Sequence, residues 1–75
     1  MEISKEAATT AAKRITRKLC IVNNFHWRDL LIFEEAICKP EKSWSYRNWI
    51  AFLLKLGLTE DQIFTTAQRR LSAGM

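Results

Sequence analysis

The stretch 53–63 constrains the fold of this chain more than any other, because it carries the end of one helix and the start of another. Gly57 follows an apolar run, and a glycine commonly ends a helix by adopting the left-handed conformation. Thr59 precedes Gln62 by three residues, which is the spacing of a capping box at a helix start. The sequence therefore predicts two helices joined by a tight turn, at approximately 46–56 and 59–71.

A narrow apolar stripe predicts a first helix at approximately 5–22. Its members are spaced by three or four residues along the chain: Ala8, Ala12, Ile15, Leu19 and Val22. Ser4 is a suitable N-cap, because its hydroxyl oxygen can accept a hydrogen bond from a backbone N–H of the first turn. Asn23 and Asn24 are expected to end this helix, since asparagine tolerates the left-handed conformation.

A second helix is expected at approximately 26–38, with Asn24 as its N-cap and Pro40 beyond its end. Its apolar face is broad and consists of Trp27, Leu30, Leu31, Phe33, Ile37 and Cys38. The helix at 46–56 is apolar around most of its circumference, so it either lies at the centre of the core or presents part of its surface to a partner. Only two glycines and one proline interrupt the chain. We therefore expect an all-α fold of four helices in one domain covering residues 1–75.

The residue types that carry catalysis do not form a recognisable constellation in this sequence. His26 is the only histidine, and a lone histidine at a helix start is expected to have a structural role. Cys20 and Cys38 belong to no CxxC motif, so we expect buried free thiols rather than a disulfide or a metal site. The adjacent pair Glu34-Glu35 points about 100° apart on a helix, which rules out a paired-carboxylate site. We expect no enzyme, no cofactor and no metal.

The apolar runs are too short for a membrane span, which requires about 18 consecutive apolar residues. The longest run, from Trp49 to Leu54, is followed by a lysine. The first residues also lack the basic-then-apolar layout of a signal peptide. A cytoplasmic protein without a membrane partner is therefore expected.

The segment 46–71 resembles the helix-turn-helix motif of DNA-binding proteins. In that motif a glycine lies in the turn, and an apolar residue about six positions later holds the second helix against the first, as Gly57 and Ile63 would do. The resemblance implies that the helix at 59–71 enters the major groove of double-stranded DNA. The side chains available for contact there are Gln62, Thr65, Thr66, Arg69 and Arg70. Glu60 and Asp61 oppose this use, because carboxylates repel phosphates.

The basic charge is concentrated near the N-terminus. The net charge is +4, and residues 1–24 contribute five basic and two acidic groups to it. Four cations lie opposite the apolar stripe of the first helix: Lys13, Arg14, Arg17 and Lys18. They can contact phosphates or simply form a solvated face. The first hypothesis is therefore a small non-enzymatic DNA-binding transcriptional regulator, in which the basic helix supports the hairpin.

The aromatic residues support a second hypothesis. Trp44 lies in a linker between helices, and together with Tyr46, Arg47 and Trp49 it has the composition of a protein-binding hot spot. An exposed patch of this kind would occupy a surface of a larger protein, for example of the transcription machinery, or would join two copies in a homodimer. The alternative function is thus a protein-binding adaptor or inhibitor. Cations that share one face would favour DNA, whereas scattered cations and a bare apolar patch would favour a protein partner.

Overall fold

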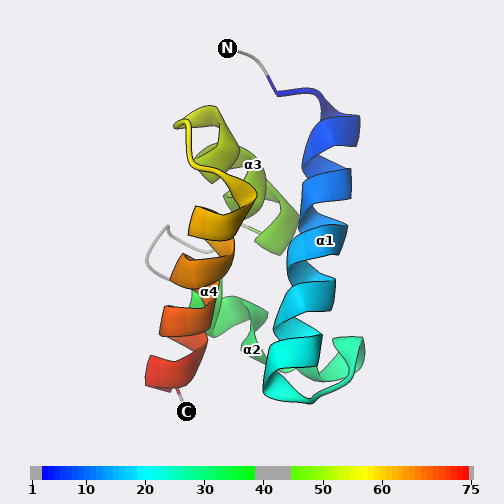
Figure 1. Cartoon of the computed structure of the whole chain (residues 1–75), viewed down its shortest axis with the longest axis vertical. Helices are drawn as coiled ribbons and strands as arrows, with labels where there is room; N and C mark the ends of the chain where they lie inside the picture. The colour runs from blue at the N-terminus through cyan, green and yellow to red at the C-terminus, as the bar shows by residue number, and fades with distance from the viewer. Residues whose placement is uncertain (1–2, 39–44, 75) are drawn as a thin grey trace.

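The computed structural model describes residues 3–38 and 45–74, which form four α-helices (Figure 1). They are α1 (Lys5–Asn23), α2 (Trp27–Cys38), α3 (Tyr46–Lys55) and α4 (Glu60–Gly74). α1 and α4 lie side by side and run in the same direction, α3 packs beside the first half of α1, and α2 crosses the end where α1 finishes (Figure 1). The predicted all-α fold of four helices is confirmed.

The helix ends lie close to the predicted ones because the capping residues act as expected. Ser4 Oγ accepts a hydrogen bond from the backbone N–H of Ala7 at 3.0 Å. Asn24 has φ 54° and ψ 49°, the left-handed conformation that ends α1. The largest difference is at the C-terminus, where α4 continues to Gly74 rather than ending near residue 71.

The hairpin between α3 and α4 contains both predicted features, the glycine that ends α3 and the capping box that starts α4. Gly57 has φ 97°, and its N–H donates to the carbonyl of Leu54, while the N–H of Leu58 donates to Leu53. These two bonds form a Schellman motif, which satisfies the last carbonyls of α3. Thr59 and Gln62 then form a reciprocal capping box, with bonds of 2.8 Å and 3.2 Å between backbone and side chain. The end of α3 and the start of α4 are therefore stabilised separately.

The capping residue of α2 differs from the predicted one, because Asn24 ends α1 and does not cap α2. The N–H of His26 donates to Asp29 Oδ2 at 3.0 Å, and His26 Nδ1 accepts from the N–H of Arg28 at 3.2 Å. His26 and Asp29 thus provide the cap, with Asp29 three residues after the capping position. The single histidine has the structural role that was expected of it.

The core is centred on α3. Trp49 and Ile50 are fully buried, and the ring of Trp49 stacks on Tyr46 with centroids 6.3 Å apart. α3 therefore lies inside the core, which is the first of the two positions predicted for this helix. The other helices surround it with Ile15 and Leu19 from α1, Leu30 and Ile37 from α2, and Ile63, Ala67 and Leu71 from α4.

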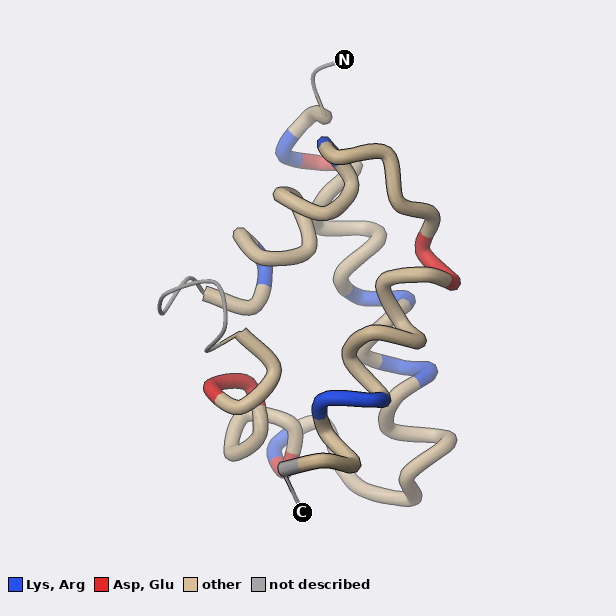
Figure 2. The backbone as a smooth tube through the Cα atoms, turned by 90° about the vertical axis from the view of Figure 1, so that its left-hand side faces the viewer, with Lys and Arg blue, Asp and Glu red and all other residues tan. Residues whose placement is uncertain are grey.

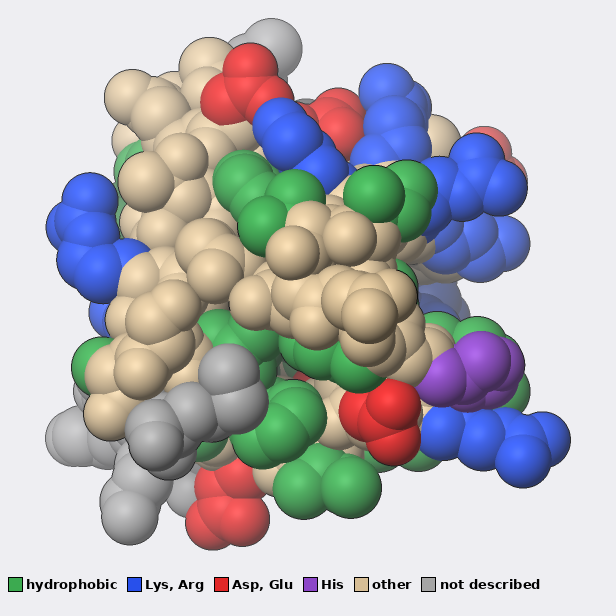
Figure 3. All heavy atoms as spheres, turned by 60° about the horizontal axis from the view of Figure 1, so that its bottom comes forward, with side chains coloured by type: hydrophobic (Ala, Val, Ile, Leu, Met, Phe, Trp, Pro, Cys, Tyr) green, Lys and Arg blue, Asp and Glu red, His purple; other side chains and the backbone are tan. Residues whose placement is uncertain are grey.

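Two of the predicted apolar faces extend beyond the core. Val22 is 56% exposed rather than buried in the stripe of α1, and Trp27 and Leu31 of α2 are 53% and 56% exposed. Val22 and Trp27 flank the turn from α1 into α2, which lies at one end of the molecule (Figure 1), and Leu31 follows one turn later in α2. Figure 3 shows apolar side chains exposed at that end, with basic side chains at both edges of the view.

Candidate binding groove

Two cations of α1 face α4 and form ion pairs with its first turn. Arg14 Nη1 lies 3.5 Å from Glu60 Oε2, and Lys18 Nζ donates to Asp61 Oδ1 at 3.2 Å. Figure 2 shows the acidic start of α4 beside the basic segments of α1. Exposed pairs of this kind stabilise a fold by only about 0–1 kcal/mol each. Their main consequence is that these two cations are neutralised on this side of α1.

A neutral polar pair continues the same interface toward the end of α1. Asn23 Nδ2 donates to Gln68 Oε1 at 2.7 Å, and Gln68 Nε2 donates to Asn23 Oδ1 at 3.2 Å. The pairing of residue 14 with 60 and of 23 with 68 follows from the parallel course of the two helices. One side of α1 therefore packs against α4.

The side chains of α4 that were predicted to contact DNA are mostly engaged within the fold. The hydroxyls of Thr65 and Thr66 donate to carbonyls one turn earlier, each at 2.9 Å. Arg70 Nη1 donates to the carbonyl of Ile37 at 2.9 Å, and its guanidinium lies 5.3 Å from the ring centroid of Trp49. Arg70 therefore binds the end of α2, and Arg69 is the exposed cation of this helix. The exposed face of α4 holds a shallow depression of about 390 Å³.

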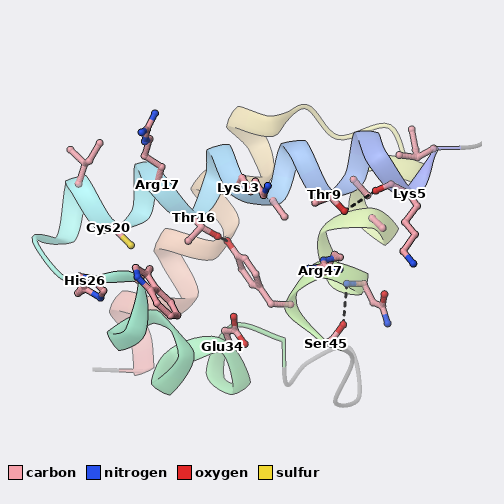
Figure 4. Close-up of a pocket in the computed structure, with 18 of the residues that line it drawn as sticks. Lys5, Thr9, Lys13, Thr16, Arg17, Cys20, His26, Glu34, Ser45 and Arg47 are labelled. Atoms are coloured by element: carbon pink, nitrogen blue, oxygen red, sulfur yellow. Dashed lines mark hydrogen bonds between the residues drawn. The ribbon is translucent and has the colours of Figure 1, made fainter.

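A larger groove runs along another side of α1, between α1 and the pair α2 and α3 (Figure 4). Its volume is about 1140 Å³. Helix α1 lines it with two rows at four-residue spacing, one of Ala8, Ala12, Thr16 and Cys20, the other of Lys5, Thr9, Lys13, Arg17 and Ile21. The opposite wall includes Trp27 and Glu34 of α2 and Tyr46, Arg47, Asn48 and Ala51 of α3. We call this feature the α1 groove.

The floor of the α1 groove is uncharged near neutral pH. Tyr46 reaches across it, and Thr16 Oγ1 donates to the phenol oxygen at 3.3 Å. Burial raises the pKa of Tyr46 to about 12. Burial, with a smaller contribution from Asp29, also raises the pKa of the Cys20 thiol, so the thiol is protonated and a poor nucleophile.

The rim of the α1 groove is basic on both sides. Lys13 and Arg17 project from α1, and Arg47 projects from the first turn of α3 (Figure 4). Lys5 adds a fourth cation near the start of α1. Among the described residues that line the groove, Glu34 is the one acidic side chain, and burial raises its pKa.

The predicted basic face of the first helix is thus divided between two surfaces. Residues four apart share a helix face, and the next residue points about 100° away. Lys13 and Arg17 therefore lie on the row that lines the α1 groove, with the Arg17 side chain directed away from α2 and α3 (Figure 4), while Arg14 and Lys18 face α4. The expectation that all four act on one ligand is not met by this arrangement.

Two residues of the predicted aromatic patch are buried rather than exposed. Trp49 is 0% exposed and Tyr46 is 7% exposed, because both rings pack into the core of the protein around α3. Arg47 is exposed and lies on the groove, and Trp44 falls outside the described residues. Sequence reasoning also missed Lys5 and Cys20 as groove residues. The sequence signal for this row was the repeat of polar side chains every four residues along α1, which places them on one face of the helix.

Neither cysteine forms a disulfide, as predicted, but only Cys38 is buried, while Cys20 is half-buried at the groove. Within residues 3–38 and 45–74 no cluster of histidine, cysteine and carboxylate side chains is suited to hold a metal ion. No helix in this part of the chain combines the length and apolar character needed to cross a membrane. Comparisons with protein families, curated proteins and solved structures gave no match to this chain.

Proposed function

We propose that this protein is a non-enzymatic binding module, an adaptor or inhibitor, that holds a segment of a larger protein in the α1 groove. The observation that carries the proposal is a long groove with an apolar floor and a charged rim. This is the general composition of a protein interface, in which an apolar centre is surrounded by polar residues. At the end of the groove, Ile21 and Trp27 are 72% and 53% exposed and add apolar surface for contact.

The dimensions of the groove fit a peptide segment. Its lining on α1 extends from Lys5 to Ile21, which corresponds to about 24 Å at the helical rise of 1.5 Å per residue. A partner helix of four to five turns, about 18 residues, has the same length. Grooves that bind amphipathic helices are a recurrent mode of protein recognition.

The distribution of cations supports a protein partner over a DNA duplex. The basic residues predicted to act together point to different sides of the molecule, and Arg14 and Lys18 are paired with carboxylates. Arg70 is held against the end of α2. An apolar surface lies bare where α1 meets α2, which is the arrangement expected for a protein-binding domain.

Site-specific photo-crosslinking in the cells that produce the protein tests this proposal. A photoreactive residue at Asn48, on the edge of the groove, should give a discrete protein adduct, and one at Lys55, outside the groove, should not. Substitution Thr9→Trp fills the groove and should abolish the adduct. Equal adducts from both positions, or adducts with nucleic acid alone, would contradict the proposal.

A second candidate function is the predicted binding of double-stranded DNA through α4. The observation that favours it is the pairing of Glu60 with Arg14 and of Asp61 with Lys18, because neutralised carboxylates repel phosphates less. Its test is duplex binding measured across a salt series, with Arg69→Glu as the variant. Binding that weakens steeply with salt and is lost in the variant would support DNA recognition. Absence of binding at about 50 mM salt, where the phosphate attraction is strong, would exclude it.

A further inference from the structure

We propose that the occupant of the α1 groove is an acidic amphipathic helix, with an apolar stripe flanked by aspartate or glutamate residues. This inference rests on the proposed function and specifies the chemistry of the partner. It follows from three features of the groove: the row of small side chains on its floor, the apolar residues at its end, and the rim cations that form no ion pair with the described residues.

The floor of the groove has the form that receives a helix. Ala8, Ala12, Thr16 and Cys20 make a row of small side chains at four-residue spacing along α1. Helices pack by placing a ridge of side chains into the depression between such rows. Ala8 and Ala12 are 5% and 9% exposed and form the base of the groove, so the ridge of a partner helix would contact mainly the half-buried Thr16 and Cys20. The Thr16 hydroxyl already donates its proton to the phenol oxygen of Tyr46, so Thr16 does not need a partner as acceptor.

The groove ends at exposed apolar surface. Ile21 is 72% exposed and Trp27 is 53% exposed, both on the lining of the groove. Covering apolar surface stabilises a complex in proportion to the area removed from water. The stripe of a helix that follows the floor would continue onto these two residues. The partner is therefore expected to be apolar along the face that meets the floor.

The rim selects a negative charge on the flanks of that stripe. In the described part of the chain, ion pairs hold Arg14 and Lys18, whereas Lys13, Arg17 and Arg47 have no carboxylate partner within 4.0 Å. These three cations lie on both sides of the groove, so carboxylates on both flanks of a partner helix would meet them. Such complementarity raises the association rate and disfavours basic partners.

A nucleic acid accounts for fewer of these observations. Its phosphates would satisfy the rim cations, but the floor of alanine, threonine and cysteine side chains would be left against a charged backbone. Base stacking along a strand requires exposed aromatic rings spaced along the groove. In the described residues the exposed rings on the lining are the neighbours His26 and Trp27, at one end of the groove, and Tyr46 is 7% exposed. The acidic helix accounts for the floor and the rim together.

The experiment is fluorescence anisotropy with a labelled synthetic peptide of about 18 residues, with leucines on one helical face and glutamates beside them. Four comparison probes isolate its features: the same peptide with lysine in place of glutamate, a scrambled peptide of equal composition, a single-stranded oligonucleotide and a duplex oligonucleotide. The acidic amphipathic peptide should bind at least about tenfold more tightly than each of the other peptides and than either oligonucleotide.

Matched charge reversals locate the binding site. The double variant Lys13→Glu/Arg17→Glu should weaken binding by at least about tenfold, and Lys55→Glu/Arg69→Glu, with the same change in net charge, by less than about threefold. All four side chains are exposed, so both variants should fold, which circular dichroism and thermal unfolding would verify. Equal weakening in both variants would overturn the inference, because it would indicate general electrostatic attraction.

The remaining outcomes separate this inference from the proposed function. If the lysine peptide binds more tightly than the acidic one and Thr9→Trp blocks it, the acidic partner is wrong and the protein-binding groove stands. If an oligonucleotide binds most tightly and the groove reversal abolishes it, the inference is overturned in favour of nucleic acid. If no peptide binds and crosslinking gives no groove adduct, both the inference and the proposed function are wrong.

Discussion

Thr16 of α1 and Tyr46 of α3 are joined by a hydrogen bond of 3.3 Å between their side-chain oxygens, at the floor of the α1 groove. This contact links the two walls of the groove and holds the phenol away from water. Tyr46 is also the only tyrosine of the chain, so its ionisation can be observed without interference from other phenols.

The phenol of Tyr46 is expected to titrate with a pKa of about 12, because burial disfavours the phenolate. A raised pKa means that the native state resists losing the proton. Stability is therefore fully present below about pH 10, the ordinary pKa of tyrosine, and falls as the pH rises toward 12, by on the order of 2–3 kcal/mol. Ultraviolet absorption of the phenolate measures the midpoint, and urea unfolding measures the stability.

The variant Tyr46→Phe is the control for this titration, since it retains the ring and removes the ionisable group. Its stability should change less above about pH 10 than that of the natural chain. A phenolate midpoint near pH 10 in the folded protein would show that Tyr46 is exposed to water and would contradict the described groove floor.

Gly57→Ala should destabilise the protein by about 1 kcal/mol, because an L-residue with a Cβ is strained at φ 97°. Nothing lies within 4 Å of the added methyl group, so the cost comes from the backbone alone. Gly57→Asn should cost less, since asparagine tolerates positive φ better than alanine. Urea unfolding of the three proteins makes the comparison, and an equal loss in both variants would argue against backbone strain.

The ion pair between Arg14 and Glu60 should contribute little stability. A double-mutant cycle with alanine at both positions should give a coupling of at most about 1 kcal/mol, and about 1 M salt should reduce it. The neutral pair Asn23 and Gln68 joins the same two helices and provides the matched comparison. Its coupling should not depend on salt. A large, salt-independent coupling for the ion pair would show that the pair is shielded from solvent.

The two cysteines should differ in reactivity. Cys38 is 2% exposed and should react with an alkylating agent only when the protein unfolds, whereas Cys20 lies half-buried at the groove. The raised pKa of Cys20 keeps its thiol protonated near neutral pH, so its reaction should be slow there and accelerate above about pH 9. Mass spectrometry of peptides after timed alkylation measures both rates. Faster modification of Cys38 than of Cys20 in the folded protein would contradict the packing of α1 and α2.

The hairpin between α3 and α4 could be predicted from the sequence because helix capping acts over short distances. Gly57, Thr59 and Gln62 specify the turn through contacts within a few residues of one another. The capping residue of α2 was predicted incorrectly for a related reason, although its start was not: Asn24 can end one helix or cap the next. Its left-handed backbone conformation assigns it to the end of α1.

The groove could not be predicted, because it depends on which sides of α1 meet α3 and α4. Neighbouring rows on α1 have similar composition, yet Lys13 and Arg17 line the groove while Arg14 and Lys18 contact α4. The burial of Trp49 is likewise a tertiary effect. Its position beside other aromatic residues in the sequence fits an exposed patch as well as a core.

A heteronuclear NMR titration with the acidic amphipathic peptide distinguishes the α1 groove from the face of α4 as the binding surface. Binding in the α1 groove should shift the amide resonances of Thr9, Arg17 and Arg47, with little change at Thr65 and Arg69. Shift changes confined to α4, with the amides of the groove unaffected, would show that the α1 groove is not the binding surface.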